Sequence, residues 1–429
     1  MAYIPEKKKL ESVQGKSKKD PSPKVGQPRM KMGWTIISVE HIHIPSVGRG
    51  TMKILALILL IICFTTFGCF EKVGSKASPY YPYEAIFNFG DSLSDTGNFL
   101  ASGALAFPVI GSLPYGQTFF RHATGRCSDG RLILDFIAEA YGLPYLPPYL
   151  KLSKGQNIHQ GVNFAVAGAT ALEAEFFYQS RIGKVLWTKD SLSVQLSWFK
   201  KLKPSLCTTA QDCERYFKKS LFVVGEIGGN DYNYAAFVGA NITQLLANVP
   251  LVVAAITKVT NELIGEGAVE IMVPGNLPVG CSAVYLTLFR SPKTEDYDQN
   301  GCLKHFNAFA QYHNKQLKLA LDTLSHNNPH VRIIYADYYG AAKRFFHAPR
   351  HFGFSSGSLK ACCGGGGPFN FNNSARCGHI GSKACTSPST YANWDGIHLT
   401  EAAYKHIAKS LIQGPFSHPP LRSSPFNIT

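Results

Sequence analysis

The 429-residue sequence has few charged residues, at 17%, and few acids relative to bases, with 28 Asp and Glu against 43 Lys and Arg. So little charge beside 45% apolar residues excludes a disordered or fibrous chain. The 39 Gly and 25 Pro follow no collagen period and therefore predict ordered turns. At about 150 residues per domain the length allows two or three domains, although one α/β domain can fill most of it.

The main part of the chain also lacks a dense basic stripe, although the net charge is +15. Residues 1–77 alone hold 13 of the 43 basic residues and only 5 of the 28 acids, so the remainder is mildly basic. No nucleic-acid-binding module is evident after residue 77. We therefore expect no nucleic-acid partner.

The amino-terminal part holds an apolar run that is too short for the about 20 residues of a membrane span. Eleven apolar residues, 54–64, follow Met52 and Lys53 and precede a region of small residues. This order is typical of a secretory signal peptide, which we place at residues 52–77. We therefore expect a secreted protein, extracellular or in the cell wall, without a permanent membrane anchor.

Residues 1–51 are polar and carry short lysine runs. This composition favours a disordered extension, and a nuclear-localisation or nucleic-acid patch is the alternative. Because a signal peptide belongs at the true amino end, we expect translation to start at Met52 and residues 1–51 to be a mis-assigned start.

The 11 cysteines include no C-x-x-C pair, so the sequence does not favour a zinc site. Two lie in the signal region, and an oxidising compartment allows the other nine to pair. Proximity suggests the bridges Cys207–Cys213 and Cys281–Cys302, and leaves Cys127 as a free thiol. Two more bridges are expected, with open connectivity, among Cys362, Cys363, Cys377 and Cys385.

Three Asn-x-Ser/Thr triplets mark acceptors for glycosylation in a secreted chain. They begin at Asn241, Asn372 and Asn427. Such triplets are frequent by chance, so they add only weak support for export.

Short apolar runs alternate with longer amphipathic ones from residue 84 to about residue 414. Five runs rich in β-branched or aromatic residues predict strands at 85–89, 162–166, 221–227, 269–273 and 331–336. Helical stretches between them include residues 248–265 and 301–324. The alternation predicts one domain over residues 78–414, a three-layer α/β/α sandwich with a mainly parallel five-stranded sheet, followed by a tail at 415–429.

Four blocks of polar and glycine residues carry the candidate chemistry, and three of them follow predicted strands. They are residues 89–98 with Ser92, residues 161–170 with Gly168, residues 228–232 with Asn230, and residues 394–400 with Asp395 and His398. Sites in open parallel sheets form at the carboxyl ends of the strands. We therefore expect the four blocks to converge there.

The residue types of these blocks suit nucleophilic catalysis. A serine hydroxyl is a poor nucleophile until an adjacent base takes its proton. Asp395 and His398 are three residues apart, so the carboxylate can bond one imidazole nitrogen while the other faces Ser92. Thr400 is expected to cap the last helix, which stops before Gly414.

The four blocks, in this order and spacing, resemble the GDSL esterase/lipase family of the SGNH hydrolase superfamily, and its plant-type secreted members most closely. The resemblance covers about residues 84–414. It implies that Ser92 is the nucleophile, that His398 is general base and later acid, and that Asp395 orients His398. It also implies an oxyanion hole formed by Ser92 N–H, Gly168 N–H and the Asn230 amide.

Simpler roles stand beside these assignments. Gly168 can serve as packing between strand and helix, and Asn230 as a turn former. Asp91 and Asp95 are expected to bond nearby backbone and shape the turn. A G-x-S-x-G pattern at residues 353–357 lacks the preceding strand that an α/β-hydrolase nucleophile needs.

The expected reaction is hydrolysis of a carboxylic ester through an acyl-enzyme, and no metal or organic cofactor is expected because serine acyl transfer needs none. Glu226 and Cys127 resemble a plant subgroup that hydrolyses specialised metabolites such as alkaloid or choline esters. This favours a small specialised-metabolite ester over a bulk lipid ester. The alternatives are a polysaccharide O-acetyl esterase and a non-catalytic secreted binding protein. Aromatic loops at 113–120 and 143–149 either line a groove or pack beneath other loops.

Overall fold

The structure is a computed structural model that describes residues 83–424, 426 and 428. The expected extension at 1–51, the signal-peptide region at 52–77 and the acceptor Asn427 lie outside the described residues.

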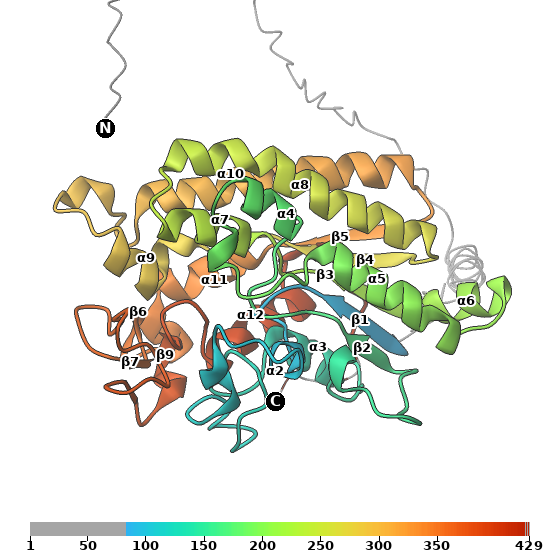
Figure 1. Ribbon diagram of the computed structural model, residues 1–429, viewed down its shortest axis with the longest axis horizontal. Helices are drawn as coiled ribbons and strands as arrows, with labels where there is room; N and C mark the ends of the chain where they lie inside the picture. Colours follow the sequence, from blue (N-terminus) through green and yellow to red (C-terminus); the bar gives the residue numbers. More distant parts are fainter. Residues whose placement is uncertain (1–82, 425, 427, 429) are drawn as a thin grey trace, which may run out of the picture. The chain divides into compact units, whose positions relative to one another are not determined.

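A six-stranded sheet forms the middle layer, with the strand order β10-β5-β4-β3-β1-β2 (Figure 1). β1 to β5 pair in parallel, and β10 pairs antiparallel with β5. The strands are β1 (Ala85–Phe89), β2 (Gly161–Asn163), β3 (Ser220–Val224), β4 (Glu270–Pro274), β5 (Arg332–Ala336) and β10 (Ser417–His418).

The strands form because their apolar side chains are needed on both faces of the sheet. All five residues of β1 are buried. Ala85, Phe87 and Phe89 belong to the core on one face, and Ile86 belongs to the core on the other. A parallel sheet covered on both faces has this continuous apolar pattern.

Helices cover both faces of the sheet. In Figure 1 α8 and α10 lie on one side of the strands, and α3 and α12 lie on the other. The helices are α2 (Asn98–Ala101), α3 (Ile133–Ala140), α4 (Ala174–Gln179), α5 (Leu192–Leu202), α6 (Ala210–Phe217), α7 (Gly229–Phe237), α8 (Ile242–Gly265), α9 (Ala283–Leu288), α10 (Lys304–Asn327), α11 (Tyr338–His347) and α12 (Glu401–Gln413). α8 is long and apolar enough to cross a membrane, but it packs along α10 and α5 as a core helix.

The three-layer α/β/α class and the five predicted strands are confirmed, with shifts at the ends. The second strand is shorter than predicted, although Phe164 N–H still bonds Asn88 O and continues the ladder. α8 begins at Ile242, six residues earlier than predicted. The reason is a capping box in which Asn241 and Gln244 bond each other's backbone N–H.

Residues after Gly414, which we expected to form a tail, continue the domain. They supply the unpredicted sixth strand, β10, at the edge of the sheet. Arg422 bonds the buried carboxylate of Glu270 in β4 at 2.6 Å, and Leu421 is buried in the core. The two-residue strand carries too short a pattern to be recognised in the sequence.

Four disulfides lie in the described part of the chain. Cys207–Cys213 and Cys281–Cys302 pair as predicted, and Cys127 is a buried free thiol. The open connectivity resolves into Cys362–Cys385 and Cys363–Cys377. These two bridges close a loop over residues 362–385, which we call the bridged loop. It contains the short strands β7 (Cys363–Gly364) and β8 (Lys383–Ala384), and it is flanked by β6 (Gly357–Ala361) and β9 (Tyr391–Asn393).

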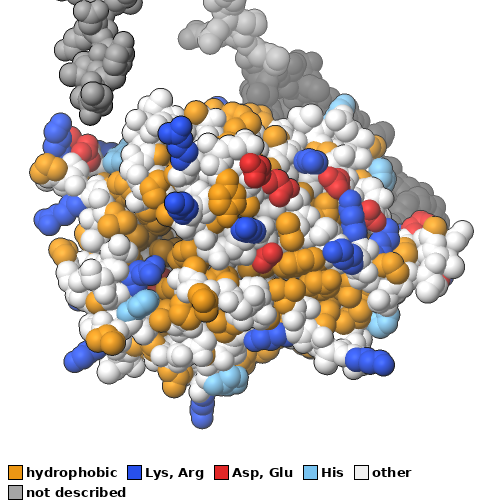
Figure 2. Space-filling view, viewed as in Figure 1, with side chains coloured by type: hydrophobic (Ala, Val, Ile, Leu, Met, Phe, Trp, Pro, Cys, Tyr) orange, Lys and Arg blue, Asp and Glu red, His pale blue; other side chains and the backbone are white. Residues whose placement is uncertain are grey.

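On the face of the molecule seen in Figure 2, Lys and Arg side chains are interspersed with acidic and neutral ones. Partly exposed ion pairs join Lys200 to Glu262 and Lys203 to Glu266. On the described part of the face in Figure 2 the basic residues form no continuous stripe.

Candidate active site

Three of the predicted side chains meet at the carboxyl end of the sheet. Ser92 lies in the turn that leaves β1, and Asp395 and His398 lie between β9 and α12. Ser92 Oγ is 2.8 Å from His398 Nε2, and His398 Nδ1 is 2.7 Å from Asp395 Oδ2. All three side chains are buried. This chain of contacts can move a proton from the hydroxyl to the imidazole.

The Asp395 carboxylate is held by four donors. Its Oδ1 accepts the backbone N–H groups of Ile397 and His398, which closes the turn. Its Oδ2 accepts His398 Nδ1–H and the hydroxyl of Tyr115, the latter at 2.9 Å. Tyr115 is fully buried and comes from a loop 280 residues earlier in the chain.

Burial and charge oppose each other in the Asp395–His398 pair. Burial alone raises the pKa of Asp395, but the His398 charge and the N–H donors outweigh it and lower that pKa to about 2. Burial lowers the pKa of His398, but the Asp395 carboxylate raises it well above 6.5. The carboxylate therefore stabilises the imidazolium that forms when His398 accepts a proton.

The turn that carries Ser92 is fixed by buried polar side chains. Asp91 Oδ1 accepts Leu93 N–H, and the Gln195 amide bonds both the N–H and the carbonyl of Gly90. Asp95 accepts four backbone N–H groups, including that of Ala167 in the second block. The expected backbone-bonding roles of Asp91 and Asp95 are thus confirmed.

Two backbone N–H groups that the resemblance assigns to the oxyanion hole have no acceptor within the described residues. They belong to Ser92 itself and to Gly168. Gly168 adopts a φ of +81°, and a Cβ there would lie 2.6 Å from the Cβ of Trp187. Only glycine fits this position without strain. The turn therefore needs a glycine for packing and also leaves its N–H free for a ligand.

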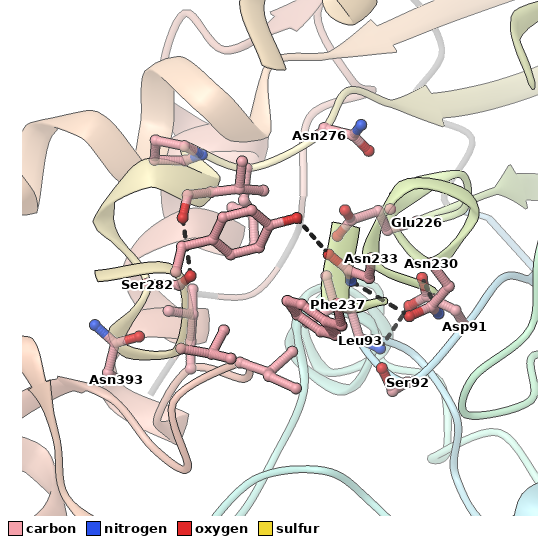
Figure 3. A pocket seen from close by; sticks show the side chains of 18 of the residues that line it. Asp91, Ser92, Leu93, Glu226, Asn230, Asn233, Phe237, Asn276, Ser282 and Asn393 are labelled. Atoms are coloured by element: carbon pink, nitrogen blue, oxygen red, sulfur yellow. Dashed lines mark hydrogen bonds between the residues drawn. The ribbon is translucent and has the colours of Figure 1, made fainter. Parts of the chain in front are cut away.

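The Asn230 amide is oriented by its neighbours at the start of α7. Tyr285 donates to Asn233 Oδ1, and Asn233 Nδ2 lies 3.5 Å from Asn230 Oδ1. Asn230 Nδ2 therefore points the other way, to Ala169 O at 3.0 Å and to Asp91 Oδ2 at 3.2 Å. Figure 3 shows Asn230 next to Asp91. Asn233 and Tyr285 were not recognised from the sequence, because nothing in their local pattern marks them.

Comparison with known proteins agrees with this geometry. The model of the GDSL-like lipase/acylhydrolase family matches residues 86–411. The chain belongs to this family. It is 56% identical over 346 residues to a GDSL esterase/lipase of Arabidopsis thaliana, covering 80% of this chain and 93% of the relative. A second GDSL esterase/lipase of that plant is 47% identical over 368 residues, covering 85% of this chain and 92% of the relative.

The GDSL family places the chain among carboxylic ester hydrolases. Two pockets of this GDSL enzyme meet at Ser92. The inner pocket extends from Ser92 past Glu226, Asn276 and Asn393. The outer pocket extends past His398 to Trp187 and to Phe371, Asn373 and Arg376 of the bridged loop. Both are bordered by Asn230, Asn233 and Phe237.

The aromatic loops at 113–120 and 143–149 border neither of these pockets. Tyr115 is buried against Phe107 and Trp394, so its loop packs beneath other elements of the GDSL enzyme. Ser355 of the G-x-S-x-G pattern is exposed, between a 3₁₀ turn and β6, and lacks the preceding strand.

Two further buried groups adjoin His398 in the GDSL enzyme. The Cys127 thiol lies beside the imidazole, and burial raises its pKa, so it is neutral at neutral pH. Glu226 is buried next to Asp91, and burial and the Asp91 charge raise the pKa of Glu226 well above 4.5.

The side chains of Asn241 and Asn372, the two described glycosylation acceptors, are exposed.

Proposed function

We propose that the protein is a secreted serine hydrolase that cleaves carboxylic esters through an acyl-enzyme. The observation that carries the proposal is the buried contact of Ser92 Oγ with His398 Nε2, backed by Asp395. The contact lies where two pockets meet, so an ester bound across the junction places its carbonyl carbon beside the hydroxyl.

The reaction then runs in two halves. His398 Nε2 accepts the hydroxyl proton while Ser92 Oγ attacks the carbonyl carbon, and the carbonyl electrons move to its oxygen. The imidazolium gives its proton to the ester oxygen as that bond breaks, so the alcohol leaves and an acyl-serine remains. Water attacks the acyl-serine in the same way, with His398 as base, and releases the acid.

The oxyanion formed in each half needs donors. The free N–H groups of Ser92 and Gly168 supply two of them. The Asn230 amide supplies the third when it exchanges its longer bond, to Asp91, for one to the oxyanion. Burial raises the pKa of Asp91 to about 7, which limits the negative charge facing that oxygen near neutral pH. Loss of one such donor typically costs about 100- to 1,000-fold in rate.

The proposed substrate is a small specialised-metabolite ester or a lipid ester, and the proposed location is extracellular or the cell wall. Four disulfides among the described residues fit an oxidising compartment. The exposed acceptors Asn241 and Asn372 are accessible for glycosylation. Amino-terminal sequencing of the protein from its native source tests secretion, and we expect no peptide from residues 1–51.

The decisive experiment compares Ser92→Ala with a matched control, Ser355→Ala, which alters the exposed serine of the other motif. We expect wild type and Ser355→Ala to hydrolyse a short-chain p-nitrophenyl ester equally, and Ser92→Ala to lose at least about 1,000-fold. A fluorophosphonate should label the peptide that contains Ser92, as read by mass spectrometry. Equal rates for wild type and Ser92→Ala, or label on Ser355, would contradict the proposal.

A further inference from the structure

The inner pocket is bordered by polar oxygen atoms that have no partner. The Glu226 side chain makes no hydrogen bond to any described residue, and its Oε2 is fully buried. The Oδ1 atoms of Asn276 and Asn393 are likewise buried without a partner. Figure 3 shows Glu226 beside Asp91 on one side of the pocket and Asn393 on the other. Within residues 83–424, no Lys, Arg or His borders this pocket.

An unpartnered buried polar group is destabilising, so native proteins rarely keep one without a use. Glu226 is only 5% exposed, and apolar residues surround the pocket. A ligand that forms a hydrogen bond with the Glu226 side chain would remove this destabilisation. The apolar residues that border the same pocket include Leu277, Val279, Val284 and Ile397.

The position of His398 assigns the two pockets to the two halves of an ester. The alcohol oxygen must receive its proton from His398 Nε2, so the alcohol part has to lie on the His398 side. His398 borders the outer pocket and does not border the inner one. The acyl part, which stays on Ser92 after the alcohol has left, therefore extends into the inner pocket.

We propose that the inner pocket is the acyl site and that Glu226 recognises a hydroxyl group on an acyl chain with an apolar body. The inference rests on the proposed function and names its substrate class. A neutral carboxyl both donates and accepts a hydrogen bond, and so does a hydroxyl. Burial raises the pKa of Glu226 well above 4.5, which favours a hydroxyl over an ammonium as its partner.

The test uses two esters that differ by one hydroxyl group: methyl 3-phenylpropanoate and methyl 3-(4-hydroxyphenyl)propanoate. The saturated linker separates the ring from the carbonyl, so both esters have the same intrinsic reactivity. We expect wild type to prefer the hydroxylated ester by at least about tenfold in kcat/KM. Glu226→Leu should lose most of this preference, Glu226→Gln should keep most of it, and Glu295→Leu, an exposed control, should keep all of it.

Two further comparisons test whether the hydroxyl group is recognised on the acyl part. Phenethyl acetate and 4-hydroxyphenethyl acetate carry the same difference on the alcohol, and here we expect no preference that depends on Glu226. An aminomethyl analogue of the first ester is the cationic arm, and it should be a poorer substrate than the hydroxylated one. A Glu226-dependent preference for 4-hydroxyphenethyl acetate would show that the inner pocket is not the acyl site. A preference for the aminomethyl ester over the hydroxylated ester would show that Glu226 recognises a cation instead of a hydroxyl group.

The outcomes also separate this inference from the proposed function. If wild type hydrolyses none of the esters, the proposed function fails. If it hydrolyses both acyl esters equally, or Glu226→Leu keeps the wild-type ratio, only the acyl-site inference fails. Should Glu226→Leu not fold, binding of the two esters to Ser92→Ala gives the answer by calorimetry. There the hydroxylated ester should bind about tenfold more tightly, and equal affinity overturns the inference.

Discussion

Tyr115→Phe tests whether a residue remote in sequence tunes the Asp395–His398 pair. The change removes the hydroxyl that donates to Asp395 Oδ2 and leaves the ring packed against Phe107 and Trp394. A hydrogen bond to a charged, buried carboxylate contributes about 1.5–3 kcal/mol. Because the ring stays in place, no cavity adds to this loss.

The size of the loss sets the expected phenotype. At about 1.36 kcal/mol per pKa unit, losing the Tyr115 hydrogen bond would raise the pKa of Asp395 by about one to two. The pKa of Asp395 is about 2 in wild type, so the carboxylate of the variant is still ionised in any ordinary assay. Its two bonds from Ile397 and His398 backbone also keep it oriented. We therefore expect less than about tenfold loss of kcat/KM at high pH, against about 10⁴-fold when such an aspartate is replaced.

The pH profile should move, and its direction follows from charge. Without the tyrosine donor, the Asp395 carboxylate attracts the imidazolium more strongly, so the pKa of His398 rises further. Only neutral His398 can act as base, so kcat/KM falls as pH drops through its pKa, which in wild type is already raised well above 6.5. The acid limb of the variant should therefore lie at higher pH than that of wild type.

The assay is kcat/KM for a p-nitrophenyl ester across pH, read at the isosbestic wavelength of p-nitrophenol. Tyr216→Phe is the matched control, because it also removes a tyrosine hydroxyl, one that donates to the carbonyl of His159. Tyr216 lies in α6, just before the amino end of β3, whereas the active site lies at the carboxyl ends of the strands. It should leave the acid limb unchanged. If the profile of Tyr115→Phe superimposes on that of wild type, the bond does not tune the pair and the reasoning is refuted.

Three other predictions follow from buried groups. Gly168→Ala should lower kcat/KM by at least about 100-fold and lower the melting temperature, since its Cβ has no room; wild-type kinetics would contradict this. Thermal stability should fall from about pH 6 to about pH 8, because Asp91 and Asp231, with folded pKa values of about 7, bind protons there that the unfolded chain has already released. Each contributes on the order of 1 kcal/mol, and calorimetry that finds a rising melting temperature over this range would refute the sign. Replacing both Cys363 and Cys377 by Ala should raise KM more than it lowers kcat, because residues of the bridged loop border the outer pocket and do not contact the Ser92 hydroxyl. A loss confined to kcat would refute this.

The sequence was sufficient for the strands and the four blocks. Strands buried on both faces are continuous apolar runs, so β1 could be placed to the residue. Asp395 and His398 lie in one short turn, so their contact follows from local spacing. Three of the blocks follow strands, and the carboxyl ends of parallel strands share an edge, so these three were expected to meet. The resemblance to the GDSL family implied that the fourth block, with Asp395 and His398, joins Ser92 there.

Contacts between side chains from irregular loops could not be predicted. Tyr115 reaches Asp395 from an irregular loop, and Gln195 reaches the backbone of Gly90 from α5, each across a long stretch of chain. The missing partner of Glu226 is visible only when the surrounding atoms are placed. The pairing of the four clustered cysteines likewise depends on where the loop folds back, and β10 is too short for its pattern to be seen.

The order of the reactive residues along the chain has a consequence for biosynthesis. Ser92 and His398 are separated by 306 residues, so His398 is translated long after Ser92. At about 5–20 residues per second, a ribosome needs roughly 15–60 s to travel from one codon to the other. During that interval the nascent polypeptide contains Ser92 but has no base to activate it. The enzyme can therefore act on esters only after His398 has been translated, and a message truncated before that codon yields a catalytically silent product.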